Sequence, residues 1–420
     1  MLLLQIIIIM IIIMMMIMIL YYPQFFENIM AQTILNGFPS MDTLFFLSGF
    51  LLSYNVLKQT KRTKSFNFSF LYKFDIATVM HFFVSGPWSY IWNMYWQPMC
   101  AKNWWKDVTF INNFNGGSCL GQTWYIAADM QMYLVAPLVI LPIYYYSAVG
   151  QYVTVLEQGL TPAPDGCIHH HPCHHLCQRP SSNPIISLLG VSTPVQTLND
   201  IYFDLVYYPS WTRASPWLVG IWVGYIFFRQ GNIKYKMSAL VVTLGWTLAA
   251  ITGLLVVFGI YSYNHFISPS PHEVMSHLTY GGLHRLAWGA VLGWVVFACH
   301  NGYGGVVNGF LSHPVWQPVS RLTYATYLVA FLMQYLLFYN SRDVYYFTHI
   351  NTIFSTVGAV VIAIGAAVLL SLMAESPIVG LEKLLLRPIP TNGVSNPVFM
   401  TENSITAEKS LEASETVTSL

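Results

Sequence analysis

Three polar residues stand inside a stretch that otherwise has the composition of a membrane helix. Residues 119–137 read Cys-Leu-Gly-Gln-Thr-Trp-Tyr-Ile-Ala-Ala-Asp-Met-Gln-Met-Tyr-Leu-Val-Ala-Pro and carry Gln122, Asp129 and Gln131. A carboxylate in hydrocarbon costs about 2.5–3.5 kcal/mol on insertion scales, so it usually faces a cavity or a partner. Asp129 is therefore a candidate for catalysis. The alternative is a buried aspartate that is satisfied by hydrogen bonds and does no chemistry.

Asp129 shares a helical face with two phenols. On a helix, Tyr125, Asp129 and Tyr133 fall at positions i, i+4 and i+8, which lie one above another. Two phenols beside a carboxylate can hold it in place and tune its affinity for a proton. We expect both tyrosines to contact substrate. The other candidates for substrate binding are Gln122, Trp124, Gln131 and Tyr327.

Two further charged residues stand near the beginning of apolar runs. Asp42 follows Phe38 closely and is a second candidate for acid–base chemistry. The alternative is that Ser40 caps this helix and that Asp42 offsets the helix dipole in the first turn. Arg213 precedes the run that starts at Ser215 and could hold a phosphate, a carboxylate or a developing oxyanion. Its alternative role is an interfacial anchor.

One histidine, His81, lies within the apolar run at about 73–96. A histidine in such a position is either a general base or a packed, hydrogen-bonded residue. His81 completes the set of catalytic candidates.

A cluster of metal-ligand residue types occupies 167–177. It holds three Cys and five His, with the cysteines spaced C-x5-C-x3-C. Such residues can bind a borderline metal, but this spacing matches no closed structural zinc site. We therefore predict no metal. A disordered insertion or a gene-model error is the preferred interpretation, and a metal-dependent membrane enzyme is the distant alternative.

The composition indicates a polytopic membrane protein. Of 420 residues, 55% are hydrophobic and only 8% are charged, whereas soluble domains carry about 25% charged residues. Aromatic residues reach 16%, which suits interfacial belts and an aromatic-lined interior. The net charge of +1 gives no reason to expect a nucleic-acid partner.

Positive charges give the apolar runs a direction. Four basic residues lie within 58–64, directly after the first of these runs, and mark a cytosolic loop. That run therefore goes from outside to inside, and residues 97–121 form an outer loop. Three basic residues within 229–236 give the run from Ser215 the same direction. Continued alternation predicts an outer loop at 264–284, which carries His284.

These runs predict an all-α, polytopic transmembrane helical bundle of about nine to ten spans. Residues 1–20 are almost pure Ile, Leu and Met, and are either a membrane anchor or a gene-model artefact. Residues 148–207 form an atypical His/Cys-rich insert, where the topology requires a span but no clean apolar run exists. Residues 388–420 are polar and predict a disordered cytosolic tail.

Two cysteines lie in the first outer loop, Cys100 and Cys119. Because that side of the membrane is oxidising, we predict a disulfide between them. An oxidising outer side fits a multi-pass protein of the endoplasmic reticulum or the plasma membrane.

Several blocks of the sequence occur in an order that resembles one family. The blocks are Cys-Leu-Gly-Gln-Thr-Trp-Tyr-Ile-Ala-Ala-Asp-Met-Gln-Met-Tyr from 119, Asp-Thr-Leu-Phe-Phe-Leu-Ser-Gly-Phe-Leu-Leu from 42, Ser-Gly-Pro-Trp from 85, Trp-Thr-Arg-Ala-Ser-Pro from 211, Ser-Arg-Leu-Thr-Tyr from 320, and Glu-Ser-Pro from 375. The ordered set resembles the nose-resistant-to-fluoxetine (NRF-like) branch of the membrane acyltransferase type-three family. The resemblance assigns a membrane domain to 36–386.

The resemblance implies an enzyme that moves an acyl group from acyl-CoA to the hydroxyl of a lipid, sterol-like or glycan acceptor. It implies acyl-CoA as co-substrate, no bound cofactor, and membrane lipids and a small hydrophobic acceptor as partners. Two departures matter. The family carries an Arg and a His, the presumed base, on its first core span, and residues 1–20 contain neither; Ala330 stands where the family often has His. The alternative is a non-enzymatic protein that binds or transports small hydrophobic molecules or lipids.

Overall fold

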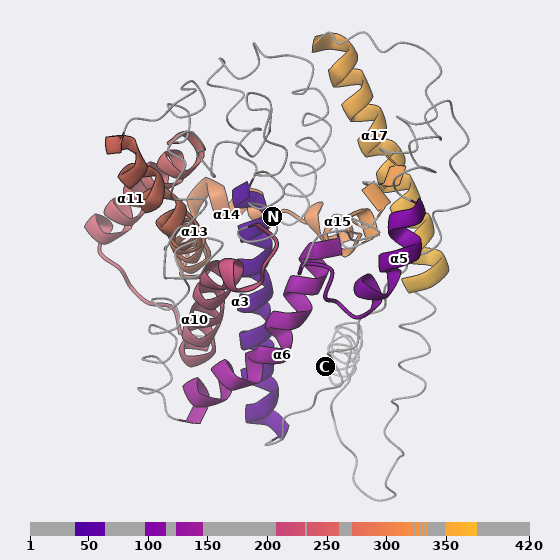
Figure 1. Cartoon of the computed structure of the whole chain (residues 1–420). Coiled ribbons are helices and arrows are strands. Elements are labelled where there is room, and N and C mark those ends of the chain that lie inside the picture. The colour runs from indigo at the N-terminus through magenta and orange to yellow at the C-terminus, as the bar shows by residue number, and fades with distance from the viewer. Residues whose placement is uncertain are drawn as a thin grey trace, which may run out of the picture. The chain divides into compact units, whose positions relative to one another are not determined.

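A computed structural model describes the helical parts of this chain (Figure 1). Every element among the described residues is helical, which agrees with the predicted all-α class. The chain divides into two units after Leu370, and of the second unit only the π-helical turn Ser371–Glu375 is described. The described residues are 38–63, 97–114, 123–145, 207–231, 233–259, 271–322, 325–327, 329–330, 332–333 and 349–375.

Four long helices run in the same direction: α3 (Phe38–Thr63), α6 (Trp124–Tyr145), α10 (Ala214–Gln230) and α13 (Pro271–His300). Helices α3 and α10 pack along much of their length, and α13 packs on both (Figure 1). Aromatic contacts place α6 beside the same group at its two ends. The common direction is the one that the positive-inside rule gives to these runs.

Small residues allow α3 and α10 to approach at backbone distance. Gly220 and Gly224 form a G-x-x-x-G pair on α10. A Cβ at Gly220 would collide with the backbone of Phe46, and one at Gly224 with the side chain of Ser53. The Ser53 hydroxyl donates to the Ile221 carbonyl at 3.0 Å. Close packing of this kind is a main source of helix association in lipid, where the hydrophobic effect between helices is absent.

Helix α6 completes the core despite two internal prolines, Pro137 and Pro142. Its ring contacts mark both ends, because Trp124 lies 6.2 Å from Phe45 and Tyr144 lies 6.2 Å from Phe228 between ring centroids. Between these contacts, aliphatic side chains of α6 pack with those of α3 and α10 in one buried cluster. Prolines are tolerated in membrane helices where neighbours satisfy the freed backbone groups.

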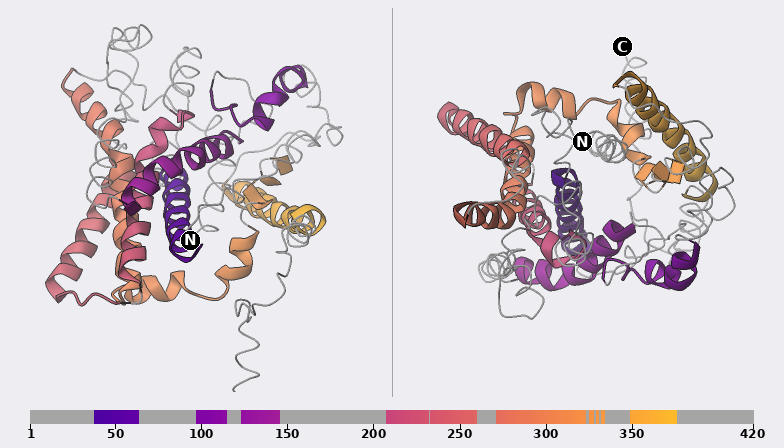
Figure 2. Two further views of the ribbon diagram at one scale, coloured as in Figure 1. Left: turned by 90° about the horizontal axis from the view of Figure 1, so that it is seen from below. Right: turned by 45° about the horizontal axis from the view of Figure 1, so that its top comes forward.

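Helix α11 (Ala239–Phe258) packs on α13 in the opposite direction (Figure 2). Ser238 caps it by accepting from the Val241 amide at 3.4 Å. Tyr280 on α13 donates to the Val256 carbonyl at 2.6 Å, which joins the end of α11 to the early part of α13. Only 11% of the α11 span is buried, against 56% for α3 and α6, so α11 offers most of its surface to lipid.

Four shorter or peripheral helices complete the description. They are α5 (Gln97–Val108), α14 (Gly305–Leu311), α15 (Trp316–Arg321) and α17 (His349–Leu370). Helix α17 contributes Ala363 to a small apolar cluster with Ile126 and Tyr327. That cluster places Tyr327, Val329 and Ala330 against Ile126 of α6.

Two local predictions from the sequence are wrong. Ser40 does not cap α3, because the helix begins at Phe38 and Ser40 lies inside it. The segment predicted as outer at 97–121 contains a short helix, α5, and its side of the membrane stays a prediction. The loop predicted at 264–284 is helical from Pro271 onward. Proline suits the first turn of a helix, where its missing N–H would have no partner in the helix, and this signal marks the true start of α13.

Five described helices are long and apolar enough to cross a membrane, so the predicted count of nine to ten spans is confirmed only in part. The predictions for residues 1–20, 148–207 and 388–420 concern residues outside the described ones. The five candidate spans are Pro39–Lys61, Trp124–Tyr145, Ala239–Phe258, Tyr280–His300 and Phe354–Met373.

The glycine contact predicts a specific cost for added volume. Gly220→Ala forces the backbones of α3 and α10 apart, so we expect a loss of stability of about 1–3 kcal/mol. Gly358→Ala on α17 is the matched control, because a Cβ there meets nothing within 4 Å. Thermal unfolding in detergent, followed by fluorescence-detected size exclusion, should show a lower midpoint only for Gly220→Ala. Equal midpoints would contradict the packing argument.

Candidate active site

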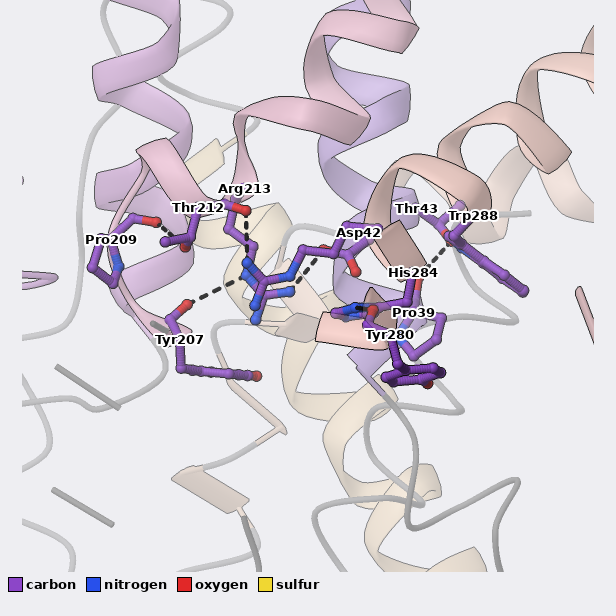
Figure 3. A network of polar contacts seen from close by, with 11 residues as sticks. Pro39, Asp42, Thr43, Tyr207, Pro209, Thr212, Arg213, Tyr280, His284 and Trp288 are labelled. Atoms are coloured by element: carbon purple, nitrogen blue, oxygen red, sulfur yellow. Dashed lines mark hydrogen bonds and ion pairs between the residues drawn. The ribbon is translucent and has the colours of Figure 1, made fainter. Parts of the chain in front are cut away.

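An ion pair joins the beginnings of α3 and α10 (Figure 3). The Arg213 Nη1 atom lies 2.7 Å from Asp42 Oδ1, and both side chains are 0% exposed. Arg213 ends the 3-10 turn η9 (Trp211–Arg213), which leads directly into α10. Removing one member of such a buried pair leaves an uncompensated charge. The pair therefore ties the two helices together at this end of the bundle.

The rest of the Arg213 guanidinium is held by backbone and aromatic rings. Its Nε donates to the Tyr207 carbonyl at 3.3 Å. Its Cζ lies 4.6 Å from the centroid of the Tyr207 ring and 5.5 Å from that of Trp124. A guanidinium over an aromatic face gains cation–π energy, and more so where water is excluded. Arg213 is thus a buried structural cation, and its predicted alternative as an interfacial anchor is wrong.

A second buried arginine, Arg285 on α13, supports the same turn. Its Nη1 donates to the Thr212 carbonyl at 2.6 Å, and the residue is 4% exposed. Three residues further on, the Trp288 indole donates to the Thr43 hydroxyl at 2.8 Å. Helix α13 is therefore bonded to both partners of the Asp42–Arg213 pair through their neighbours. Sequence reasoning missed Arg285, although an arginine inside an apolar run is a signal for a functional or paired charge.

His284 stands next to Arg285 and is held from its own helix. Its Nδ1 lies 2.8 Å from the Tyr280 carbonyl oxygen, and its ring stacks on that of Tyr280 with centroids 5.0 Å apart. Because a carbonyl only accepts, Nδ1 carries the hydrogen. The charges of Arg285, Asp42 and Arg213 all act on the ring, and Figure 3 shows His284 near Asp42. His284 keeps partial exposure, whereas the three charged residues are buried.

Asp129 lies deeper along the bundle, between α6 and α3. It is 5% exposed and accepts a hydrogen bond from the Ser48 hydroxyl at 2.5 Å. Ser48 is six residues beyond Asp42 on α3, which is about 9 Å along a helix at 1.5 Å per residue. The sequence argument that Asp129 needs a polar partner is therefore confirmed. Its chemical role stays a prediction.

The aromatic candidates gather around the two carboxylates. Tyr125 lies 4.8 Å from Phe45 and 5.7 Å from Tyr327 between ring centroids, so two tyrosines that are 202 positions apart in the sequence are in contact. The Trp124 ring lies beside Tyr207 and under Arg213. Tyr133 packs against the main apolar cluster. The structure thus brings Trp124, Tyr125 and Tyr327 together, and their contact with substrate stays a prediction.

Gln131 organises the segment that precedes Arg213. Its Nε2 donates to the Phe110 carbonyl at 2.7 Å and to Asn113 Oδ1 at 2.8 Å. Its Oε1 accepts from Ser210 and from Asn113. Both N–H groups and the carbonyl oxygen are therefore used within the protein. The network assigns Gln131 a structural role, and its predicted contact with substrate is not tested.

Several predicted residues lie outside the described part of the chain. They are His81, Gln122 and Cys119, together with the His/Cys cluster at 167–177. Cys100 is described and is buried on α5. Within the described residues, no group of three His, Cys, Asp or Glu could hold a metal ion.

The sequence of this chain matches one known protein family. The model of the acyltransferase-3 family, described as an acyltransferase domain, matches residues 3–372. This chain belongs to the acyltransferase-3 family. Its helices and its membership together describe a multi-pass membrane protein of that family.

Two relatives in Caenorhabditis elegans are similar over part of their length. Nose resistant to fluoxetine protein 6 is 29% identical over 406 residues, which cover 86% of this chain and 46% of that protein. Regulator of hypoxia-inducible factor 1 is 26% identical over 161 residues, which cover 37% of this chain and 31% of that protein. The chain therefore spans less than half the length of either relative. No solved structure matches. The predicted NRF-like resemblance is confirmed.

The ion pair predicts strong coupling between α3 and α10. Asp42→Asn leaves the buried Arg213 charge without its carboxylate, so we expect a loss of about 3–5 kcal/mol. The double variant Asp42→Asn with Arg213→Gln should cost less than the sum of the two single changes. Unfolding of the four proteins in detergent gives the coupling energy. Arg229→Gln, at an exposed position on α10, is the control, and additive losses would contradict the pairing.

Proposed function

We propose that this protein is an integral membrane acyltransferase that moves an acyl group from acyl-CoA to the hydroxyl of a lipid, sterol-like or glycan acceptor. The family match across residues 3–372 carries the proposal, since it supports a transferase in general. The thioester donor and the hydroxyl acceptor are the finer part of the proposal. Neither the donor nor the acceptor follows from the family alone.

The chemistry needs a polar centre within a membrane protein. The acceptor oxygen forms a bond to the acyl carbon, the carbon–sulfur bond of the thioester breaks, and the acceptor proton must leave. Hydrogen-bond donors must stabilise the oxyanion that develops on the acyl oxygen. The buried charges at the beginnings of α3 and α10, and Asp129 below them, supply such a centre. Intramembrane ionisable groups of this kind usually mark functional sites.

We assign Asp129 to orienting the acceptor and the Asp42–Arg213 pair to holding the site in place. Asp129 accepts from Ser48, and a carboxylate can accept further hydrogen bonds with its remaining lone pairs. It can therefore accept from an incoming hydroxyl as well. Asp42 already gives one oxygen to Arg213 at 2.7 Å, so it supports the site better than it could act as a base.

Topology places this centre toward the outer face. The basic loops put the ends of α3 and α10 far from Asp42 and Arg213 in the cytosol. We therefore propose that the acceptor reaches the centre from the outer side and that acyl-CoA is supplied from the cytosol. A complete bundle of nine to ten spans, in the endoplasmic reticulum or the plasma membrane, is part of this proposal.

The proposal predicts transfer that depends on Asp129. Purified protein in nanodiscs, given radiolabelled acetyl-CoA and a total lipid extract, should place label in a lipid-soluble product. Asp129→Asn should lower the rate by about 10- to 100-fold, because its neutral amide oxygen accepts more weakly than a carboxylate and hydrogen bonds to charged groups contribute about 1.5–3 kcal/mol. Ser48→Ala should lower it about tenfold, since one hydrogen bond to a charged group contributes about 1.5 kcal/mol or more.

Thr247→Val is the matched control for this experiment. Thr247 lies exposed on α11 and its hydroxyl bonds to the Leu244 carbonyl of its own helix at 2.9 Å. The control should transfer at the wild-type rate. Label in no product with any of the four proteins would contradict the proposal and favour a protein that binds or transports small hydrophobic molecules.

A second prediction concerns the outer side of the membrane. We propose that Cys100 is linked to Cys119, because both lie in the segment that topology places in an oxidising compartment. Proteolysis without reductant, followed by mass spectrometry, should find one peptide that contains both residues. Reduction should split it into two. Alkylation of both cysteines in unreduced protein would contradict the link.

A further inference from the structure

Among the described residues, the proposed function gives neither carboxylate the role of base: one oxygen of Asp42 is paired with Arg213, and Asp129 is assigned to orienting the acceptor. We infer that His284 takes the proton of the acceptor hydroxyl, an inference that rests on the proposed function. His284 falls on α13, in a helix where the sequence predicts a loop. The argument depends on three features of the residue: its tautomer, its charged neighbours and its exposure.

The tautomer leaves one ring nitrogen able to accept a proton. The Tyr280 carbonyl accepts from Nδ1 at 2.8 Å, so in the neutral ring Nε2 carries a lone pair. No hydrogen bond in the described part of the chain occupies Nε2. The Tyr280 carbonyl therefore fixes the tautomer of this imidazole and the direction of its basic nitrogen. A carboxylate has the same role beside the histidine of other sites.

The ring is also fixed in orientation. It stacks on Tyr280 with an angle of 2° between the planes. The Tyr280 hydroxyl is in turn bonded to the Val256 carbonyl of α11 at 2.6 Å. A base gains most when its position is set before the reaction, because no reorganisation is then required. Helix α11 thus anchors the tyrosine, and the tyrosine holds the histidine.

The charged neighbours can respond to a proton on the ring. Asp42, Arg285 and Arg213 all interact electrostatically with His284. Burial of the ring and the two guanidinium groups disfavour the imidazolium, so the ring starts neutral with Nε2 able to accept, and the Asp42 carboxylate favours the imidazolium that forms in the reaction. The indole of Trp288, one turn further along α13, keeps this helix bonded to Thr43 beside Asp42.

Exposure separates His284 from the rest of the cluster. Asp42 and Arg213 are 0% exposed and Arg285 is 4% exposed, whereas His284 is half-buried. Among these four residues, His284 is therefore the one that is not fully buried. The buried charges position and polarise it but cannot themselves touch an acceptor.

The step balances with the groups named. The acceptor O–H gives its proton to His284 Nε2 while its oxygen electrons form the bond to the acyl carbon. The carbon–sulfur bond of acyl-CoA then breaks, and the coenzyme A thiolate leaves with that electron pair. His284 returns the proton to the thiolate, so that the products are an ester and free coenzyme A and the ring is neutral again.

Two variants of His284 separate a catalytic role from a structural one. His284→Asn keeps an amide N–H near the position of Nδ1, where it can still donate to Tyr280, but it has no basic nitrogen. His284→Ala leaves a space that free imidazole can enter. The exposed His313→Asn, on the loop between α14 and α15, is the control. Each protein is assayed in nanodiscs with radiolabelled acetyl-CoA and a total lipid extract, with and without added imidazole as an external base.

We expect a loss of at least about 100-fold in both His284 variants and none in His313→Asn, in line with the contribution of general bases. We expect imidazole to restore at least about tenfold to His284→Ala and nothing to Asp129→Asn. An active wild type with His284→Asn within threefold of it overturns the inference and leaves the proposed function standing. A loss that imidazole does not reverse, with a lower melting temperature, shows a structural role and also overturns it. An inactive wild type overturns the proposed function, and the inference with it.

Discussion

The buried ion pair between Asp42 and Arg213 is the constraint on which the rest of this bundle depends. Arg213 stands immediately before α10, where the helix dipole presents its positive end and disfavours a cation. Taking both charges out of water carries a desolvation penalty of several kcal/mol per ion, which their attraction offsets only with good geometry and further hydrogen bonds. The Tyr207 carbonyl and the rings of Tyr207 and Trp124 supply that further support. Without Asp42, Arg213 would face its own helix dipole in an apolar setting.

The ion pair also accounts for the register of the helices below it. Once Asp42 and Arg213 meet, the two parallel helices advance together at equal rise per residue. Phe46 and Phe50 then reach the glycines of α10, and no side chain there can be larger than hydrogen. A shift of one turn would bring bulky residues against the α3 backbone. The ion pair at one end of α3 and α10 and the steric fit along their length therefore favour the same register of the two helices.

Sequence reasoning predicted the helices better than the site. Composition and loop charges were enough for the class and for the direction of α3, α10 and α13, because burial in lipid requires long apolar helices. The polar partner of Asp129 was also expected, but Ser48 could not be named, since nothing in a sequence gives the rotation of one helix against another. From the sequence, Asp42 was interpreted as offsetting the dipole of its own helix, whereas its observed partner, Arg213, lies 171 residues further along the chain. His284 was assigned to a loop that ended just before Arg285, and the pairing that makes charge tolerable within a helix is visible only in three dimensions.

The same constraint explains why a base would stand on α13 and not on the helices that carry the ion pair. Asp42 on α3 and Arg213 at the beginning of α10 are buried by the contact between those two helices. Helix α13 is bonded to that contact through Arg285 and Trp288, yet it keeps one neighbouring side chain, His284, at the edge. Its ring is stacked on Tyr280, which α11 holds by a hydrogen bond. A rigid, charged centre with one basic nitrogen suits proton transfer in a membrane, because fixed dipoles there replace the solvation that water would supply.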